Sequence, residues 1–277
     1  MGQSVRVAEM TPDTLNLPLG QHRRPCPQCD RGPRDRALSI KIDGDGATFI
    51  CHRCGYTGAD NPTRDTYPRA PRQEPKADPL EWSAAAEAIW RRTQGLRRTL
   101  GATYLQSRGC AMPPRDSHLR FLPADGSYPP SLCAAVTDVL TAKPISLHFT
   151  RLAADGGGKA GGDCDRRLLK GHRKAGGCIR LWPDSDVHSG LAIAEGIETS
   201  LAAAHAFTPV WSCVDAGNMA AFPVLPGVES LTIFADNDPA GIRASAAVAD
   251  RWAAAGREVR LVMPPTVGAD VNDMVRQ

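Results

Sequence analysis

The sequence predicts an α/β domain at the C-terminal end of the chain, preceded by a basic α+β region and a small four-cysteine module. Two apolar runs near the C-terminus each lead into an acidic cluster and then an alanine-rich helical stretch, the order expected of a parallel sheet. Two Cys-x-x-Cys pairs lie near the N-terminus, and Lys and Arg are in excess between the two regions. These features divide the chain into residues 1–56, 57–79, 80–190 and 191–277.

Each acidic cluster stands where a buried strand should end. The apolar run 191–194 leads into Glu195, and the run 231–235 leads into Asp236 and Asp238. Carboxylates at the carboxyl ends of neighbouring parallel strands meet in one crevice. Hard divalent cations such as Mg²⁺ need oxygen ligands and take one or two carboxylates each, so the clusters predict a magnesium site for phosphoryl transfer.

A third acidic stretch, residues 268–273, completes an ordered set of motifs. A Glu-Gly follows the first strand, and an Asp-x-Asp followed by Ala-Gly follows the second. Each motif alone also fits a capped helix with surface acids, but in this order they resemble the Toprim domain of DnaG-type primases, topoisomerases and RecR proteins. The resemblance implies one or two catalytic Mg²⁺ or Mn²⁺ ions, held by Glu195, Asp236, Asp238 and Asp270.

Two departures from the family pattern concern a second metal. The family usually has Asp four positions after the first Glu, where this chain has Thr199, with Glu198 one residue earlier. In the third stretch, the family's second Asp falls on Asn272, with Asp273 beside it. The ligands of a second metal therefore stay open among Glu198, Asn272 and Asp273.

The N-terminal module is predicted to bind zinc. Two Cys-x-x-Cys pairs are separated by 21 residues, a spacing that lets four thiolates close a tetrahedral Zn²⁺ site. Between them, the alternating segments 37–42 and 47–50 are joined by an Asp-Gly-Asp-Gly turn, which predicts the hairpin of a zinc ribbon. Four protein ligands leave no open position on the metal, so one structural zinc is expected. The predicted ligands are Cys26, Cys29, Cys51 and Cys54.

Basic and aromatic residues around the cysteines suggest contact with nucleic acid. Arg31, Arg34 and Arg53 are predicted to follow the backbone of a single strand. Phe49 and Tyr56 offer stacking faces for bases, although Phe49, on a strand, fits the core of the ribbon better.

The net charge of +3 hides an asymmetry along the chain. Counting Lys and Arg against Asp and Glu, residues 1–80 carry +2, residues 81–190 carry +6 and residues 191–277 carry −5. An acidic domain that can bind metal, joined to a basic region, fits a protein that binds polyphosphates or nucleic acid. Any single basic residue also fits a solvated surface. No run of 18 apolar residues and no signal pattern is present, so we expect a cytoplasmic protein with no membrane partner.

A predicted linker separates the four-cysteine module from a region of predicted helices and strands. Residues 57–79 are rich in Pro, Arg, Asp and Thr without apolar periodicity, which predicts a flexible linker. Apolar periodicity then predicts helices over 80–92 and 98–108. Strands are expected over 119–122, 134–140 and 145–152.

The segment 145–182 extends the family resemblance. DnaG-type primases carry a lysine-bearing stretch ahead of the Toprim domain, and residues 166–171 are similar to it in order and spacing. In the family this basic region faces the metal site and contacts nucleotide phosphates or template. Asn218, in the segment 210–219 that is predicted as a strand ending in a turn, is a candidate nucleotide contact that also fits a helix cap. The resemblance implies phosphate contacts from Lys170, His172, Arg173 and Lys174.

Together these predictions describe a compact DNA primase, most similar to those of phages, plasmids and other mobile elements in a bacterial host. It would join NTPs into short RNA primers on a single-stranded DNA template. The sequence contains no P-loop, so a replicative helicase, if one is used, must be a separate chain. Two other classes stay open, a RecR-like DNA-binding clamp and a Toprim nuclease. A topoisomerase is excluded because the chain is too short for a strand-passage gate.

Overall fold

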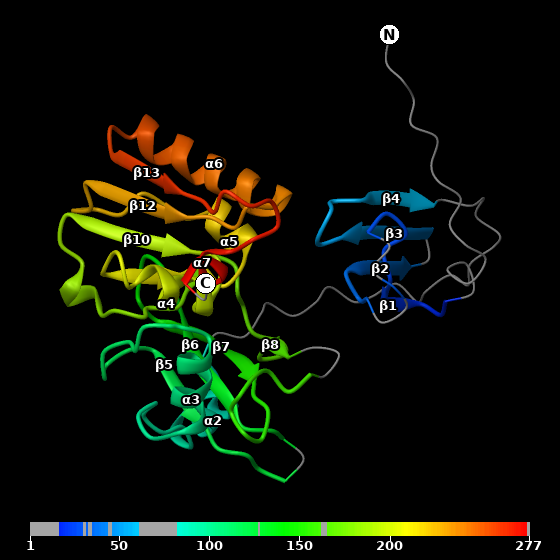
Figure 1. Cartoon of the computed structure of the whole chain (residues 1–277), viewed down its shortest axis with the longest axis horizontal. Helices are drawn as coiled ribbons and strands as arrows, with labels where there is room; N and C mark the ends of the chain where they lie inside the picture. Colours follow the sequence, from blue (N-terminus) through cyan, green and yellow to red (C-terminus); the bar gives the residue numbers. More distant parts are fainter. Residues whose placement is uncertain are drawn as a thin grey trace. The chain divides into compact units, whose positions relative to one another are not determined.

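The computed structural model describes residues 17–29, 32, 35–43, 46–60, 82–126, 128–161 and 165–275. The chain forms two compact units, residues 1–77 and 78–277, and each is described by itself (Figure 1). Arg31 and Arg34, predicted to contact nucleic acid, lie outside the described residues, as does the greater part of the predicted linker.

The N-terminal unit is built on a four-stranded antiparallel sheet, blue in Figure 1. Its core consists of alternate strand residues, among them Ile40, Ile42 and Phe49, as expected of strands with one buried face. The predicted hairpin is present, and Phe49 is a core residue rather than a stacking face. The strands, in sheet order, are β1 (Gly20–Arg24), β2 (Leu38–Asp43), β3 (Gly46–Cys51) and β4 (Thr57–Asp60).

β4 lies where the sequence predicts the start of the linker. It pairs with β3 through the backbone, and the hydroxyl of Thr57 donates a hydrogen bond to the carbonyl oxygen of Phe49 at 2.9 Å. Gly58 lies against the ring of Phe49, where a Cβ atom would overlap the ring. β4 is held by backbone pairing and by the close approach of Gly58 to Phe49, not by apolar side chains. It therefore has no apolar periodicity that the sequence could show.

The first part of the C-terminal unit is an antiparallel sheet with two helices, cyan and green in Figure 1. Helix α2 (Ala84–Arg91) begins at Ser83, whose side chain accepts a hydrogen bond from the N–H of Ala86, and α3 (Leu100–Ser107) begins after Thr99. The strands are β5 (Leu119–Leu122), β6 (Ser131–Asp138), β7 (Pro144–Arg151) and β8 (Arg166–Leu168), in that order, with β9 (Gly177–Cys178) paired to β6.

β6 is shifted toward the N-terminus relative to the predicted strand 134–140. The side chain of Asp138 accepts hydrogen bonds from the N–H groups of Leu140 and Thr141 at 3.1 and 2.9 Å. These bonds close a turn, so the strand ends at Asp138.

The two faces of this sheet bury different clusters. Leu132 and Val136 of β6 pack in the same cluster as Tyr104 of α3, and Cys133 and Ala135 pack with α2. The first cluster continues into the C-terminal part of the unit through helix α4 (Ile197–Ala203), so the two parts share one core.

The second part is a four-stranded parallel sheet with the order β11-β10-β12-β13, yellow-green to red in Figure 1. The short 3-10 helix η1 (Asp184–Asp186) precedes it. Its strands are β10 (Gly190–Ala194), β11 (Val210–Ser212), β12 (Ser230–Phe234) and β13 (Glu258–Val262), and its further helices are α5 (Ala216–Ala220), α6 (Pro239–Ala254) and α7 (Val271–Val275).

Helices cover both faces of the parallel sheet, as predicted. Ile193 of β10 packs with Trp252 of α6, and the next residue, Ala194, packs with Ala202 of α4. A continuous apolar strand between two helical layers is typical of an α/β domain. Among the described residues, no helix is long and apolar enough to span a membrane.

Candidate active site and zinc-binding cluster

The carboxyl ends of β10 and β12 bring acidic side chains to one edge of the parallel sheet. The two strands are paired in register, with Ala194 opposite Phe234. Glu195 and Asp236 follow these ends and line a cavity of about 50 Å³ together with Asp270. The structure thus brings together three of the four predicted carboxylates.

Asp270 reaches the cavity because its loop is tied to the end of β12. The N–H of Gly268 donates to the carbonyl oxygen of Asn237 at 2.6 Å, and the N–H of Asn237 donates to the carbonyl oxygen of Ala269 at 3.0 Å. The side-chain amide of Asn237 also donates to the carbonyl oxygen of Pro264 at 2.9 Å. These bonds fix the third acidic stretch beside the second.

The fourth predicted carboxylate, Asp238, caps helix α6. Its Oδ1 accepts hydrogen bonds from the N–H groups of Ala240 and Gly241 at 2.9 and 2.7 Å. A Cβ atom at Gly241 would overlap the backbone carbonyl oxygen of Asp236, so glycine is what lets the helix begin this close to the site. Asp238 does not line the cavity, although its charge raises the pKa of Glu195.

The electrostatics of the cavity fit a divalent cation. Burial, together with the charges of Glu195 and Asp270, raises the pKa of Asp236 to about 7. Burial and the charge of Asp238 also raise the pKa of Glu195. Oδ1 of Asp236 is buried without a hydrogen-bond partner among the described residues. Crowded carboxylates with an unpaired buried oxygen are the donor set that a hard cation needs.

A buried ionic cluster lies beside this cavity. Glu198, in the first turn of α4, is 2% exposed. Its carboxylate accepts hydrogen bonds from Arg166 Nη2 at 2.9 Å and from the Tyr104 hydroxyl at 2.7 Å, and Lys159 Nζ lies 3.5 Å away. Burial alone would raise the pKa of Glu198, but Arg166 and Lys159 hold it at about 2.

Arg166 connects the ionic cluster to the acidic cavity. It lines the cavity, and its charge lowers the pKa of Asp236 against the effect of burial. The sequence places Arg166 in the basic stretch but does not mark it as a site residue. Glu198 was left open as a ligand of a second metal, whereas in the structure both of its carboxylate oxygens contact cations or a hydroxyl.

His148 is a site residue that no motif indicates. It lies on β7, where the pairing of Thr150 with Arg166 places these three side chains on one face of the sheet. Burial lowers the pKa of His148 to about 4, so the imidazole is neutral at pH 7. It lines the cavity, and its Nδ1 has no hydrogen-bond partner in the described part of the chain. Such a ring can bond a polar group of a substrate.

The four basic residues predicted to hold phosphates do not line the acidic cavity. Lys170 lines a separate pocket of about 380 Å³ together with Tyr128 and Arg151. His172 is fixed by its ring, with Nε2 2.9 Å from the hydroxyl of Ser83 and Nδ1 3.1 Å from the carbonyl oxygen of Lys170. Lys170 and His172 therefore do not face the carboxylates of the acidic cavity.

Arg173 and Lys174 are paired with acids. Arg173 Nη2 lies 2.9 Å from Asp138, and Lys174 Nζ lies 2.6 Å from Asp215. The charge of Asp215 in turn raises the pKa of Glu195. Lys174 is thus connected to the acidic cavity through Asp215.

Asn218 has a structural position. It is buried, and its Nδ2 donates to the carbonyl oxygens of Lys174 and Gly177 at 2.9 and 3.1 Å. The cap of α5 is Asp215, whose Oδ1 accepts a hydrogen bond from the N–H of Asn218 at 2.9 Å. Asn218 thus ties the basic segment to α5, and both donors of its amide are in use.

The four cysteines of the N-terminal unit form a compact cluster. Their sulfur atoms all lie within 4.8 Å of one another. Cys26 Sγ lies 3.7 Å from Cys54 Sγ, and Cys29 Sγ lies 3.7 Å from Cys51 Sγ. A tetrahedral site with Zn–S bonds of about 2.3 Å has sulfur–sulfur edges of about 3.8 Å, so the cluster fits one Zn²⁺ with a closed ligand set.

Arg53 stands next to this cluster. Its N–H donates to Cys51 Sγ at 3.4 Å, and its guanidinium pairs with Asp35 at 3.1 Å. The side chain remains 47% exposed, so part of the guanidinium can still contact a partner.

Two families match the C-terminal unit. Residues 190–277 match the family described as a Toprim domain, and residues 81–181 match a domain of unknown function, DUF7146. A comparison with curated proteins returned no match.

Several bacterial primase structures are similar to the chain. They include a DNA primase domain from Pseudomonas aeruginosa (15% identity, 68% of this chain and 58% of that chain, TM-score 0.38). The zinc-binding and RNA polymerase domains of the Aquifex aeolicus primase have 13% identity over 93% of this chain and 75% of that chain, with a TM-score of 0.43. The RNA polymerase domain of the Mycobacterium tuberculosis primase has 15% identity over 71% and 63%, with a TM-score of 0.36.

The family match and the geometry coincide on the same residues. Glu195, Asp236 and Asp270 lie in the matched region, at the strand ends and loop that line one cavity. The chain resembles DnaG-type primases in carrying a four-cysteine cluster ahead of this region. The predicted fold is confirmed here: residues 190–277 of this chain form a Toprim domain.

Proposed function

We propose that this chain is a DNA primase that synthesises short RNA primers from NTPs on a single-stranded DNA template. The observation that carries the proposal is the convergence of Glu195, Asp236 and Asp270 in one cavity, beside Arg166. Acids that attract divalent metal, next to a cation that attracts phosphate, suit nucleotidyl transfer. We infer that the chain is most similar to the primases of phages and plasmids.

The reaction would be attack of a ribonucleotide 3′-hydroxyl on the α-phosphorus of an incoming NTP. The new P–O bond forms as the bond to the β-phosphate bridging oxygen breaks, and pyrophosphate leaves. Mg²⁺ or Mn²⁺ held by Glu195, Asp236 and Asp270 would neutralise charge on the reacting phosphates. Glu195, whose pKa is raised by burial, would either hold the metal or assist deprotonation of the hydroxyl.

Residues around the carboxylates would position the nucleotide. Arg166 is already held by Glu198, so it can present a fixed guanidinium to a phosphate without further ordering. Lys174 reaches the same region through Asp215. Neutral His148 can bond a hydroxyl or phosphate oxygen, because its Nδ1 has no partner among the described residues.

The zinc ribbon would serve the template rather than the chemistry. Its four cysteines leave no open coordination position on the metal, so a structural role follows. Arg53, together with Arg31 and Arg34 outside the described residues, would contact the phosphate backbone of the single strand.

One assay separates this function from its two alternatives. The protein is incubated with labelled NTPs, Mg²⁺ and single-stranded DNA, and both nucleic acids are resolved by size. Oligoribonucleotides that depend on template support a primase. Shortened DNA without new RNA indicates a Toprim nuclease, and shifted but intact DNA indicates a RecR-like clamp. Either of the last two results would overturn the proposal.

A further inference from the structure

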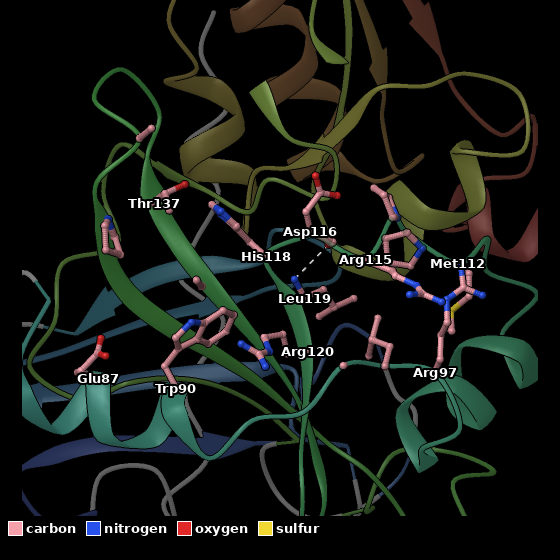
Figure 2. A pocket seen from close by; sticks show the side chains of 18 of the residues that line it. Glu87, Trp90, Arg97, Met112, Arg115, Asp116, His118, Leu119, Arg120 and Thr137 are labelled. Atoms are coloured by element: carbon pink, nitrogen blue, oxygen red, sulfur yellow. Dashed lines mark hydrogen bonds between the residues drawn. The ribbon is translucent and has the colours of Figure 1, made fainter. Parts of the chain in front are cut away.

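A second, larger pocket lies in the region that matches the domain of unknown function (Figure 2). Its volume is about 830 Å³, within the roughly 300–1,000 Å³ typical of small-molecule sites. Its walls come from α2, the segment 112–120, β6 and the hairpin that joins β6 to β7. It shares no lining residue with the acidic cavity, so the proposed primer synthesis does not account for it.

The middle of this pocket contains a stack of planar groups. The guanidinium carbon of Arg120 lies 5.2 Å from the ring centroid of Trp90, and Trp82 meets Trp90 edge to face at 6.4 Å. Two hydrogen bonds hold the stack: Trp82 Nε1 donates to Glu87 at 2.7 Å, and Arg120 donates to the carbonyl oxygen of Thr93 at 3.2 Å. Trp90 and Arg120 are only partly buried, so a planar base can extend the stack from the pocket side.

One end of the pocket is cationic. Arg97 and Arg115 come from separate segments and, in Figure 2, occupy the side of the pocket opposite Glu87. Both side chains are exposed, and neither forms a hydrogen bond or ion pair with a described residue. Glu87 does not offset them, because it pairs with Arg91 at 2.8 Å, and the other acid that lines the pocket is Asp116. Two unpaired guanidinium groups suit a phosphate.

A polar group without a partner lies toward the other end. His118 lines the pocket near Thr137 in Figure 2, and its buried Nδ1 has no hydrogen-bond partner among the described residues. Burial and the charge of Arg180 lower the pKa of His118, so the ring is neutral and can donate or accept one hydrogen bond. The His118 side chain is partly exposed and forms no hydrogen bond with a described residue, so its ring can pair with a polar edge of a ligand.

We propose that this pocket is a nucleotide-binding site distinct from the catalytic carboxylates. The base lies against the stack of Trp90 and Arg120, with its edge toward His118, and the phosphates lie on Arg97 and Arg115. The same chemistry is offered by a free nucleoside triphosphate and by one nucleotide of a single strand. No metal ion is needed for either, because the cations are supplied by the protein.

The test is a set of calorimetric titrations on the full-length, zinc-loaded protein without Mg²⁺ or Mn²⁺. The probes are ATP, a single-stranded oligodeoxyadenylate and tripolyphosphate, which has no base. The variants are Arg97→Ala/Arg115→Ala, Trp90→Leu and, as a matched control, Arg243→Ala on α6, which removes an exposed arginine outside the pocket. Circular dichroism checks that each variant is folded.

We expect ATP or the oligonucleotide to lose about tenfold or more in affinity in the double arginine variant and to keep it in Arg243→Ala. Trp90→Leu should weaken the probes that carry a base and leave tripolyphosphate unchanged. The probe that responds identifies the source of the nucleotide. The proposal is overturned if neither ATP nor the oligonucleotide binds, or if both bind the double variant as tightly as the wild type. The same titrations are run on Asp236→Ala, whose substitution lies outside this pocket. Binding of the probes to this variant as to the wild type shows that the pocket can be judged separately from the catalytic proposal.

Discussion

Arg166 Nη2 lies 2.9 Å from Oε2 of Glu198, and this ion pair joins strand β8 to the first turn of helix α4. The Tyr104 hydroxyl and Lys159 complete the surroundings of the same carboxylate, so α3 and the loop before β8 also meet there. The cluster fixes α4 against the antiparallel sheet, and with it the strand end that carries Glu195. It therefore links the stability of the unit to the geometry of the acidic cavity.

Replacing Glu198 by Gln should destabilise the C-terminal unit by about 1–3 kcal/mol, because the buried carboxylate loses its charge-assisted bonds to Arg166 and Lys159, while these two cations remain partly exposed to solvent. All five tryptophans lie in residues 78–277, so denaturant unfolding followed by tryptophan fluorescence reports this unit alone. Glu229→Gln removes an exposed carboxylate and is the matched control. Equal stability of Glu198→Gln and the wild type would contradict the role of the cluster.

The same pair of proteins tests the pH dependence. The pKa of Glu198 is held at about 2, below its ordinary value, so its ionisation stabilises the fold at pH values above that ordinary value. As the pH falls below the ordinary pKa, Glu198 is protonated in the unfolded chain but not in the folded protein. The stabilisation therefore decreases until the pH reaches the pKa of the folded state. The difference in unfolding free energy between wild type and Glu198→Gln should therefore shrink as the pH is lowered from about 5 to about 3. A constant difference would show that the carboxylate is not ionised in the native state.

Gly241→Ala should impair synthesis although no catalytic group is changed. The added Cβ would overlap the carbonyl oxygen of Asp236, so the start of α6 or the end of β12 must shift. A displacement of about 1 Å at a reacting centre can cost roughly a hundredfold in rate. Rates of primer synthesis measure the effect, with Gly256→Ala as a comparison at a glycine where a Cβ meets no atom within 4 Å but φ is +73°. Similar losses in the two variants would indicate general destabilisation rather than movement of Asp236.

Asp236→Ala should abolish primer synthesis while the protein stays folded. Burial and the neighbouring acids raise the pKa of this carboxyl to about 7, so its removal relieves repulsion in the metal-free protein. Thermal unfolding without divalent cations should therefore show equal or greater stability than the wild type. Synthesis at the wild-type rate by the folded variant would refute the catalytic assignment.

The order of motifs was sufficient to predict the Toprim fold, because strand ends followed by acids are local features of the chain. Glu195 and Asp236 follow paired parallel strands, and this register could be expected from two similar apolar runs. The ribbon cysteines were equally predictable, since their spacing alone limits the coordination geometry.

The partners of Glu198 could not be predicted in this way. Tyr104 lies 94 positions away along the chain, and no periodicity indicates that α3 and α4 will meet. Arg166 and Arg167 are neighbours of the same type, and only the pairing of β8 with β7 decides which of them faces the acids. Burial of Glu198 thus depends on tertiary packing rather than on a local pattern.

Loss of one zinc ligand should affect the N-terminal unit alone. Cys54→Ser should release one zinc per chain, detected with a chromogenic chelator, and unfold residues around the ribbon because small zinc modules depend on metal for folding. Tryptophan fluorescence should not change, since that unit contains no tryptophan. Cys133→Ser, which alters a buried cysteine outside the cluster, should keep its zinc. Purified protein without zinc, or an intact ribbon in chelator, would contradict the assignment.

Lys170 and Lys174 should have separable effects, although both belong to the basic stretch. Lys174 pairs with Asp215, whose charge acts on Glu195, so Lys174→Ala should raise the KM for NTP several-fold with little change in template affinity. Lys170 lines a separate pocket with Arg151 and has no part in the acidic cavity. Lys170→Ala should therefore weaken single-strand binding and flatten its dependence on salt, because a lost phosphate contact releases fewer counterions.

The measurements are an NTP titration of synthesis and a salt titration of template binding for each variant. Arg53→Ala on the ribbon is the reference for a template contact. The guanidinium of Arg53 is half-exposed, and it belongs to the N-terminal unit, whereas the acidic cavity belongs to the C-terminal unit. Its pattern should match that of Lys170→Ala and differ from that of Lys174→Ala. If Lys170→Ala instead raises the KM for NTP and leaves the salt dependence unchanged, Lys170 contacts the triphosphate, and the pocket that it lines is not a template surface.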